Sequence, residues 1–258
     1  MSNLVPRLGF ALTSLADFED RRLAADVVGL MTSAENELSP VRYSAYEPVL
    51  TKLDRRHLDP LVDVWLNAGR TPEPPTAPRV GSLLLAGPND GVSYQVSWGK
   101  SNVPTFPFVA GDIDIALVNS HGGLLEAWLD LIKRLAVRLN PLYGDIFNMS
   151  LRGWDTPHDL LKRLPDVQWT SIYGRPYVEM FGEAHICNAP FHRVDVLSPG
   201  LMWVQATPDI FEAVPEDVRS RIRQHLGEEA FMSGGQWRYQ TGKAPDFDFS
   251  NVVLTPAS

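Results

Sequence analysis

Residues 80–118 repeatedly alternate apolar with polar side chains, and this pattern restricts the fold more than any other feature of the chain. The alternation is clearest over residues 92–98, whose apolar members are Val92, Tyr94, Val96 and Trp98. A period of two places such side chains on one face of a β-strand. The preceding Asp90-Gly91 accepts the positive φ of a hairpin turn. This region is therefore predicted to form paired strands with one buried face.

A strongly amphipathic helix is predicted directly after these strands, over residues 124–139. Its apolar side chains recur every three or four positions, which places them on one stripe of a helix. Further strands are predicted at residues 143–151 and 167–173, followed by a hairpin of residues 194–197 and 201–206. Strands joined partly by hairpins and partly by single helices are typical of a mixed α+β fold.

The first 69 residues are predicted to be helical. Apolar spacing favours one helix over residues 17–37, capped by Asp17, and a second over residues 52–68. Four prolines within residues 70–79 exclude a helix interior or a central strand there. The predicted organisation is a helical N-terminal segment (1–69), a Pro-rich linker (70–79) and an α+β domain (80–258). In that domain an antiparallel or mixed sheet packs with helices; the alternative is one continuous globular unit.

Composition and charge exclude several classes of protein. Apolar residues make up 44% of the chain and it has seven tryptophans, so a packed core is expected rather than disorder. No run approaches the roughly 18 apolar residues that a membrane-spanning helix needs. The formal net charge of −8 disfavours direct contact with nucleic acid. One cysteine and the lack of a signal-peptide pattern in residues 1–10 favour a cytoplasmic location, with no membrane contact.

The chain carries no local catalytic signature. We find no phosphate-binding glycine loop, dinucleotide fingerprint, nucleophile elbow or paired-histidine zinc motif. The densest set of potential metal ligands is His185, Cys187 and His192; in a strand, the first two would share a face. A metal-dependent hydrolase is therefore the alternative function, but packed or solvated side chains are the favoured interpretation. We predict no enzyme activity, no catalytic residue, no metal and no cofactor.

Four segments in the middle and C-terminal regions resemble one group of families. They read YQVSW, LNPLYGDIFN, VQWTSIYGRPYVEMFG and APFHRVDVLSPGLMWVQATP. Together they make residues 92–231 similar to the immunity-protein-52-like families of bacterial polymorphic toxin systems. Some of these proteins protect against effectors of the type VI secretion system, including nuclease toxins. The resemblance implies a cytoplasmic antidote that binds one cognate toxin and inhibits it stoichiometrically, and it carries over no catalytic residue.

Acidic side chains and one tryptophan are the candidate contacts with such a toxin. A nuclease toxin is expected to be basic where it binds its substrate, so carboxylates would complement it, and a buried aromatic ring would anchor the interface. The candidates are Asp112, Asp114, Glu179, Glu183, Trp237, Asp246 and Asp248. The alternative interpretation of the two Asp-x-Asp pairs is the solvated face of a strand. A role as an adaptor or chaperone that loads an effector for secretion also stays open.

Overall fold

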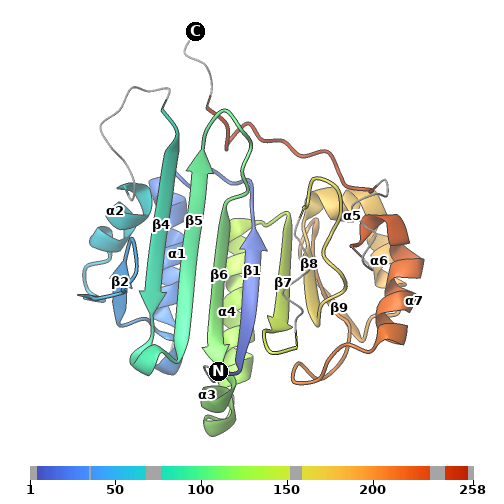
Figure 1. Ribbon diagram of the computed structural model, residues 1–258, viewed down its shortest axis with the longest axis horizontal. Coiled ribbons are helices and arrows are strands. Elements are labelled where there is room, and N and C mark those ends of the chain that lie inside the picture. The colour runs from blue at the N-terminus through green and yellow to red at the C-terminus, as the bar shows by residue number, and fades with distance from the viewer. Residues whose placement is uncertain (1–4, 35, 68–76, 152–158, 233–241, 255–258) are drawn as a thin grey trace. The chain divides into compact units, whose positions relative to one another are not determined.

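The computed structural model describes residues 5–34, 36–67, 77–151, 159–232 and 242–254 (Figure 1). The contacts within the chain divide it into two compact units. Unit 1 consists of Met1–Pro141 together with Asp248–Ser258, and unit 2 consists of Leu142–Phe247. Each unit has strands and helices of its own, so each is described by itself.

Unit 1 contains six antiparallel strands in the order β3-β2-β4-β5-β6-β1. They are β1 (Arg7–Thr13), β2 (Arg42–Ser44), β3 (Thr51–Lys52), β4 (Arg79–Ala86), β5 (Val92–Lys100) and β6 (Phe108–Asp114). In β5, Val96 pairs with Leu83 of β4 on one side and with Val109 of β6 on the other, and all three side chains are fully buried. The alternation predicted for residues 92–98 is confirmed, because its four apolar side chains are buried.

The helices of unit 1 are α1 (Arg21–Ser33), α2 (Asp59–Asn67), α3 (Ile115–Ser120) and α4 (Leu124–Leu139), with short 3-10 turns η1 (Asn36–Leu38) and η2 (Pro88–Asp90). Helices α1 and α4 cover one face of the strands, whereas α3 lies beyond the end of β6 (Figure 1). The helix α4 spans the predicted residues, and its Trp128 ring meets Phe10 of β1 edge-on at 5.8 Å. Asp20, rather than Asp17, caps α1 by accepting a hydrogen bond from the Arg22 backbone N–H.

Unit 2 contains four antiparallel strands in the order β7-β8-β10-β9. Its strands are β7 (Tyr143–Asn148), β8 (Thr170–Tyr173), β9 (Arg193–Ser198) and β10 (Leu201–Gln205). Its helices are α5 (Arg175–Phe181), α6 (Glu183–Cys187) and α7 (Glu216–Leu226), followed by the turn η3 (Glu228–Ala230). Phe181 is central to the aromatic core, with its ring centroid 5.7 Å from Tyr173, 6.3 Å from Tyr177 and 6.2 Å from Phe231. The predicted hairpin of β9 and β10 is confirmed.

The predicted helical N-terminal segment is wrong, although the mixed α+β content is correct. Besides α1 and α2, the first 69 residues contain β1, β2 and β3. In β1, Leu8, Phe10 and Leu12 are buried while Arg7, Ala11 and Thr13 are less so, which is the period of a strand. This run is short, and its partner β6 lies far along the chain. A strand that depends on a distant partner leaves only a weak local signal, and the neighbouring helical pattern of α1 concealed it.

The predicted linker at residues 70–79 falls mostly outside the described residues. The strand β2 precedes these residues in the chain and β4 follows them, and the two strands pair with each other, for example Tyr43 with Leu85. Both strands belong to unit 1.

Candidate functional site

One face of the strands in unit 1 has no helix over it among the described residues. In Figure 1, α1 and α4 lie behind β4, β5, β6 and β1, while the front of these strands is bare. The register places Ala11 beside Ala110, and Ala110 beside Gln95. Ser82, Ser93, Ser97 and Thr13 lie on the same face, together with the larger Leu84, Gln95 and Phe108. We call this surface the open sheet face.

A charged cluster lies at one end of the open sheet face. Arg7 Nε contacts the Asp112 carboxylate and lies 3.2 Å from Asp114 Oδ1. Ser93 Oγ donates a hydrogen bond to Asp112 Oδ2 at 2.6 Å. Burial raises the pKa of Asp112, while the Ser93 hydrogen bond and the Arg7 charge oppose this rise. The predicted contact residues Asp112 and Asp114 therefore share one site, but Arg7 already pairs with both.

The cluster continues into a groove of about 550 Å³ on the same face. Arg7 Nη2 donates to the backbone carbonyl of Asp90 at 2.9 Å, and Arg42 Nη2 pairs with Asp90 Oδ1 at 2.5 Å. The loop between β2 and β3 supplies the far wall of the groove, including Leu50, which is 72% exposed. The groove thus combines ion pairs with an exposed apolar side chain.

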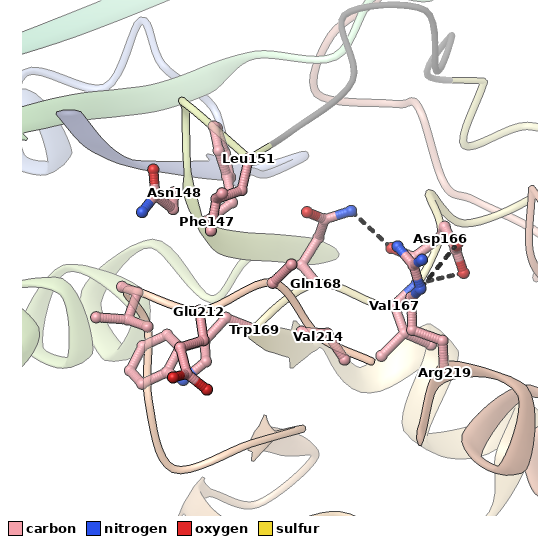
Figure 2. Close-up of a pocket in the computed structure, with 12 residues that line it drawn as sticks. Phe147, Asn148, Leu151, Asp166, Val167, Gln168, Trp169, Glu212, Val214 and Arg219 are labelled. Carbon is pink, nitrogen blue, oxygen red and sulfur yellow. Dashed lines mark hydrogen bonds and ion pairs between the residues drawn. The ribbon is translucent and has the colours of Figure 1, made fainter. Parts of the chain in front are cut away.

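A second hollow, of about 110 Å³, lies within unit 2 (Figure 2). Its lining comes from the end of β7, the segment before β8, the loop before α7 and the start of α7. Figure 2 shows Asp166, Gln168 and Arg219 on one side, and Trp169 with Glu212 on another. We call this hollow the unit 2 pocket. Its lining residues are Phe147, Asn148, Leu151, Asp166, Val167, Gln168, Trp169, Ile210, Glu212, Ala213, Val214 and Arg219.

Two lining residues of the unit 2 pocket, Asp166 and Arg219, belong to a network of two arginines and two carboxylates. Arg223 donates to Asp166 Oδ1 and to Glu216 Oε1, both at 2.5 Å. Arg219 Nη2 lies 2.7 Å from Glu216 Oε2, and its Nε lies 3.8 Å from Asp166 Oδ2. The hydrogen bond from Arg223 holds the pKa of Glu216 below its usual value. The network of two arginines and two carboxylates is therefore close to charge-balanced.

The remaining predicted contact residues are distributed over both units. Glu179 on α5 and Glu183 on α6 are exposed in unit 2, as is Asp246. Asp248 is exposed in unit 1, and its carboxylate accepts a hydrogen bond from the Ser250 backbone N–H at 2.9 Å. Trp237 lies outside the described residues. The structure thus brings together Asp112 and Asp114, and leaves the four other acidic candidates at exposed positions.

The strand assumed for the alternative metal site is wrong. His185 and Cys187 lie in the helix α6, where residues two apart do not share a face. The His185 ring instead stacks on His225 at 4.2 Å, and its Nε2 donates to the His225 backbone carbonyl at 2.7 Å. Within the described ranges, no group of three or more His, Cys, Asp or Glu side chains could hold a metal ion.

Comparisons with known proteins show a likeness of fold to a solved structure. No family model matches this chain, and no curated protein sequence matches it. The fold is similar to that of the Pseudomonas aeruginosa T6SS protein PA0821, with a TM-score of 0.53 and 14% identity. The match covers 86% of this chain and 75% of that protein. The resemblance to the immunity-protein-52-like families therefore stays a prediction. None of the helices in the described residues has the length and apolar character needed to cross a membrane.

Proposed function

We propose that this chain is an immunity protein that binds a cognate nuclease effector of the type VI secretion system and inhibits it stoichiometrically in the cytoplasm. The observation that carries the proposal is the fold it shares, over 86% of its length, with a T6SS protein. The resemblance of residues 92–231 to immunity families supports the same system independently. The net charge of −8 suits a basic partner such as a nuclease.

The open sheet face is the proposed surface for the effector. Its small side chains, such as Ala11, Ala110 and Ser97, leave room for another protein to approach the strands closely. At its charged end, three carboxylates accompany two guanidinium groups: those of Asp90, Asp112 and Asp114 against those of Arg7 and Arg42. This excess of negative charge complements a basic partner, and charge complementarity of this kind sets the rate and specificity of association.

The exposed Leu50 beside the groove would provide an apolar contact for the same partner. Asp112 and Asp114 are proposed to contact the effector, although both already pair with Arg7. A cationic side chain of the effector would therefore either displace Arg7 or bind the carboxylates beside it. The exposed carboxylates of Glu179, Glu183, Asp246 and Asp248 remain proposed secondary contacts.

Co-expression tests this proposal directly. The toxic domain encoded by the neighbouring gene is produced in sensitive cells with and without this chain, and the complex is then isolated. We expect growth rescue and a stoichiometric complex. Rescue without a complex would instead indicate enzymatic repair of the damage. Loss of effector secretion, without self-intoxication, in cells that lack this protein would indicate an adaptor or chaperone.

A matched pair of variants tests the surface. Ala110→Arg places a long cationic side chain in the middle of the open sheet face, where its strand neighbours are Gln95 and Ala11. Ala127→Arg places the same side chain on the exposed side of α4. We expect Ala110→Arg to abolish the complex and the rescue, and Ala127→Arg to leave both unchanged. Equal binding by the two variants would show that the effector binds elsewhere.

A further inference from the structure

The strand β9 is an edge strand of unit 2. Among the described residues it pairs with β10 on one side and with no strand on the other. None of its six residues is buried, and the Val196 side chain is 54% exposed. The edge of a strand presents unpaired backbone N–H and C=O groups, which readily pair with another strand. The outer side of β9 can therefore accept a further strand.

The length and composition of β9 leave this edge open to pairing. Edge strands are often kept from pairing by being very short or by carrying lysine or proline. Strand β3, the last in the order of unit 1, has only two residues. In contrast, β9 has the sequence RVDVLS, with neither lysine nor proline. Its register shift against β10 lies at Leu201 and Met202, opposite the end of β9. The charges in the first half of β9 therefore decide which strand it can accept.

These charges are complementary to those of a second copy of the same strand. Arg193 and Asp195 lie on one face of β9, with Arg193 Nε 2.9 Å from Asp195 Oδ1 and with side chains 58% and 25% exposed. Residues directly opposite each other in an antiparallel pair share a face of the sheet. When two β9 strands pair about a twofold axis at Val194, Arg193 of each copy therefore lies opposite Asp195 of the other.

The neighbouring registers lack this complementarity. A twofold axis that keeps the sheet continuous passes between two identical residues, so the alternatives near the middle of β9 are Asp195 and Val196. An axis at Asp195 places two carboxylates opposite each other, which is destabilising. An axis at Val196 places Asp195 opposite the apolar Leu197. Of these three registers, only the one centred on Val194 forms two ion pairs between the copies.

We propose that two copies of this chain associate through β9, paired antiparallel about a twofold axis at Val194, with Arg193 of each copy bound to Asp195 of the other. The two Val194 side chains meet on the opposite face. Such an interface uses the same surface of both copies, so association ends at the dimer. The inference is independent of the proposed immunity function, because it uses no residue of the open sheet face.

Reciprocal charge variants of the full chain test the ion pairs. Asp195→Arg leaves two arginines in each strand, and Arg193→Asp leaves two aspartates. Sedimentation is measured over a dilution series that extends to the solubility limit, and circular dichroism checks that each variant is folded. Arg221→Asp is the matched control, because it makes the same change of charge on the exposed side of α7.

We expect the unchanged chain and Arg221→Asp to reach twice the mass of one chain. Asp195→Arg and Arg193→Asp, each alone, should stay monomeric over the same series, because like charges then lie opposite each other. An equimolar mixture of these two variants should restore the dimer, since every arginine then lies opposite an aspartate.

Cysteine cross-linking tests the register without altering either charge. The single native cysteine, Cys187, is exposed and is first replaced by serine. In the proposed register the two residues at position 194 face each other, with Cα atoms about 4.5–5.5 Å apart, within reach of a disulfide. The two residues at position 196 lie roughly 13 Å apart along the strands, which is too far. Under mild oxidation, Val194→Cys should give a covalent dimer and Val196→Cys should not.

The proposal is overturned if the unchanged chain is monomeric at every concentration. It is also overturned if either charge variant alone still forms the dimer, or if the mixture of folded variants does not restore it. Cross-linking of Val196→Cys that equals or exceeds that of Val194→Cys would exclude the proposed register.

Discussion

Each unit holds an arginine between two carboxylates, and the two arrangements differ in their burial. In unit 1, Arg7 lies between Asp112 and Asp114 on the open sheet face, and all three side chains are about one quarter exposed. In unit 2, the Arg223 side chain is 8% exposed and joins α7 to Asp166, in the segment before β8. The same chemistry therefore serves an accessible surface in one unit and an internal connection in the other.

The carboxylates of the two clusters respond differently to their surroundings. Burial raises the pKa of Asp112, so its surroundings disfavour the charged form despite the nearby Arg7. The hydrogen bond from Arg223 lowers the pKa of the exposed Glu216, so its surroundings favour the charged form. The comparison teaches that an arginine at contact distance does not by itself decide the charge of a carboxylate, because burial acts against it.

The largest expected effect follows from removing the internal arginine. Arg223→Ala leaves Asp166 without its closest partner in a partly buried position, and we expect unit 2 to lose about 3 kcal/mol of stability, the lower end for a broken buried pair. Denaturant unfolding measures this loss. Arg221→Ala is the matched control, because Arg221 pairs with Asp217 on the exposed side of the same helix and should cost roughly 0.3–0.5 kcal/mol. Equal losses in the two variants would contradict the internal role of Arg223.

A smaller effect is expected from the arginine of the open sheet face. Arg7→Ala should cost about 1 kcal/mol, because its pairs are accessible to water and Asp112 keeps the hydrogen bond from Ser93. The variant also frees two carboxylates, so it should strengthen binding to a basic effector in a salt-dependent manner. Unfolding and binding measurements separate the two effects. A stability loss as large as that of Arg223→Ala would remove the distinction drawn between the clusters.

The smallest effect is a difference in pH dependence. Glu216 has a lowered pKa in the folded chain, so its contribution to stability is present above its usual value of 4.5 and is lost as the pH falls through the folded pKa. Asp112 has a raised pKa, so its contribution is present below its usual value of 3.8 and is lost as the pH rises through the folded pKa. Lowering the pH should therefore decrease the stability of α7 and increase that of β6.

Amide hydrogen exchange in α7 and β6, corrected for the intrinsic effect of pH, follows this difference. Glu216→Gln should flatten the dependence in α7, and Asp112→Asn should flatten it in β6. A parallel response of both elements, unchanged in these variants, would show that neither carboxylate is responsible.

The sequence by itself determined the elements whose signals are local and long. The helix α4 has a continuous apolar stripe, and the structure places it over the predicted residues. The alternation over residues 92–98 likewise identified β5 and its buried face. The alternation in the strand that begins at residue 108 indicated that Asp112 and Asp114 lie on its solvated face, where they are partly exposed. Such patterns are readable because each depends on residues within a few positions of one another.

Short segments were misassigned where the local signal was ambiguous. The strand β1 was missed beside the helical pattern of α1, and His185 and Cys187 were placed on a strand although they lie in α6. In both segments, packing against distant residues decides the structure: β1 pairs with β6, and His185 stacks on His225 of α7. Intrinsic preference is a weak guide for runs of this length.

Only the tertiary structure decided which side chains meet at the two sites. The register of β1 against β6 brings Arg7 to Asp112 and Asp114, and no spacing in the sequence shows this pairing. Folding of unit 2 likewise brings Trp169 and Arg219 to one pocket from separate segments. The physical reason is the same in both sites: a hydrogen bond or ion pair depends on distance in space, whereas a sequence pattern records only neighbours along the chain.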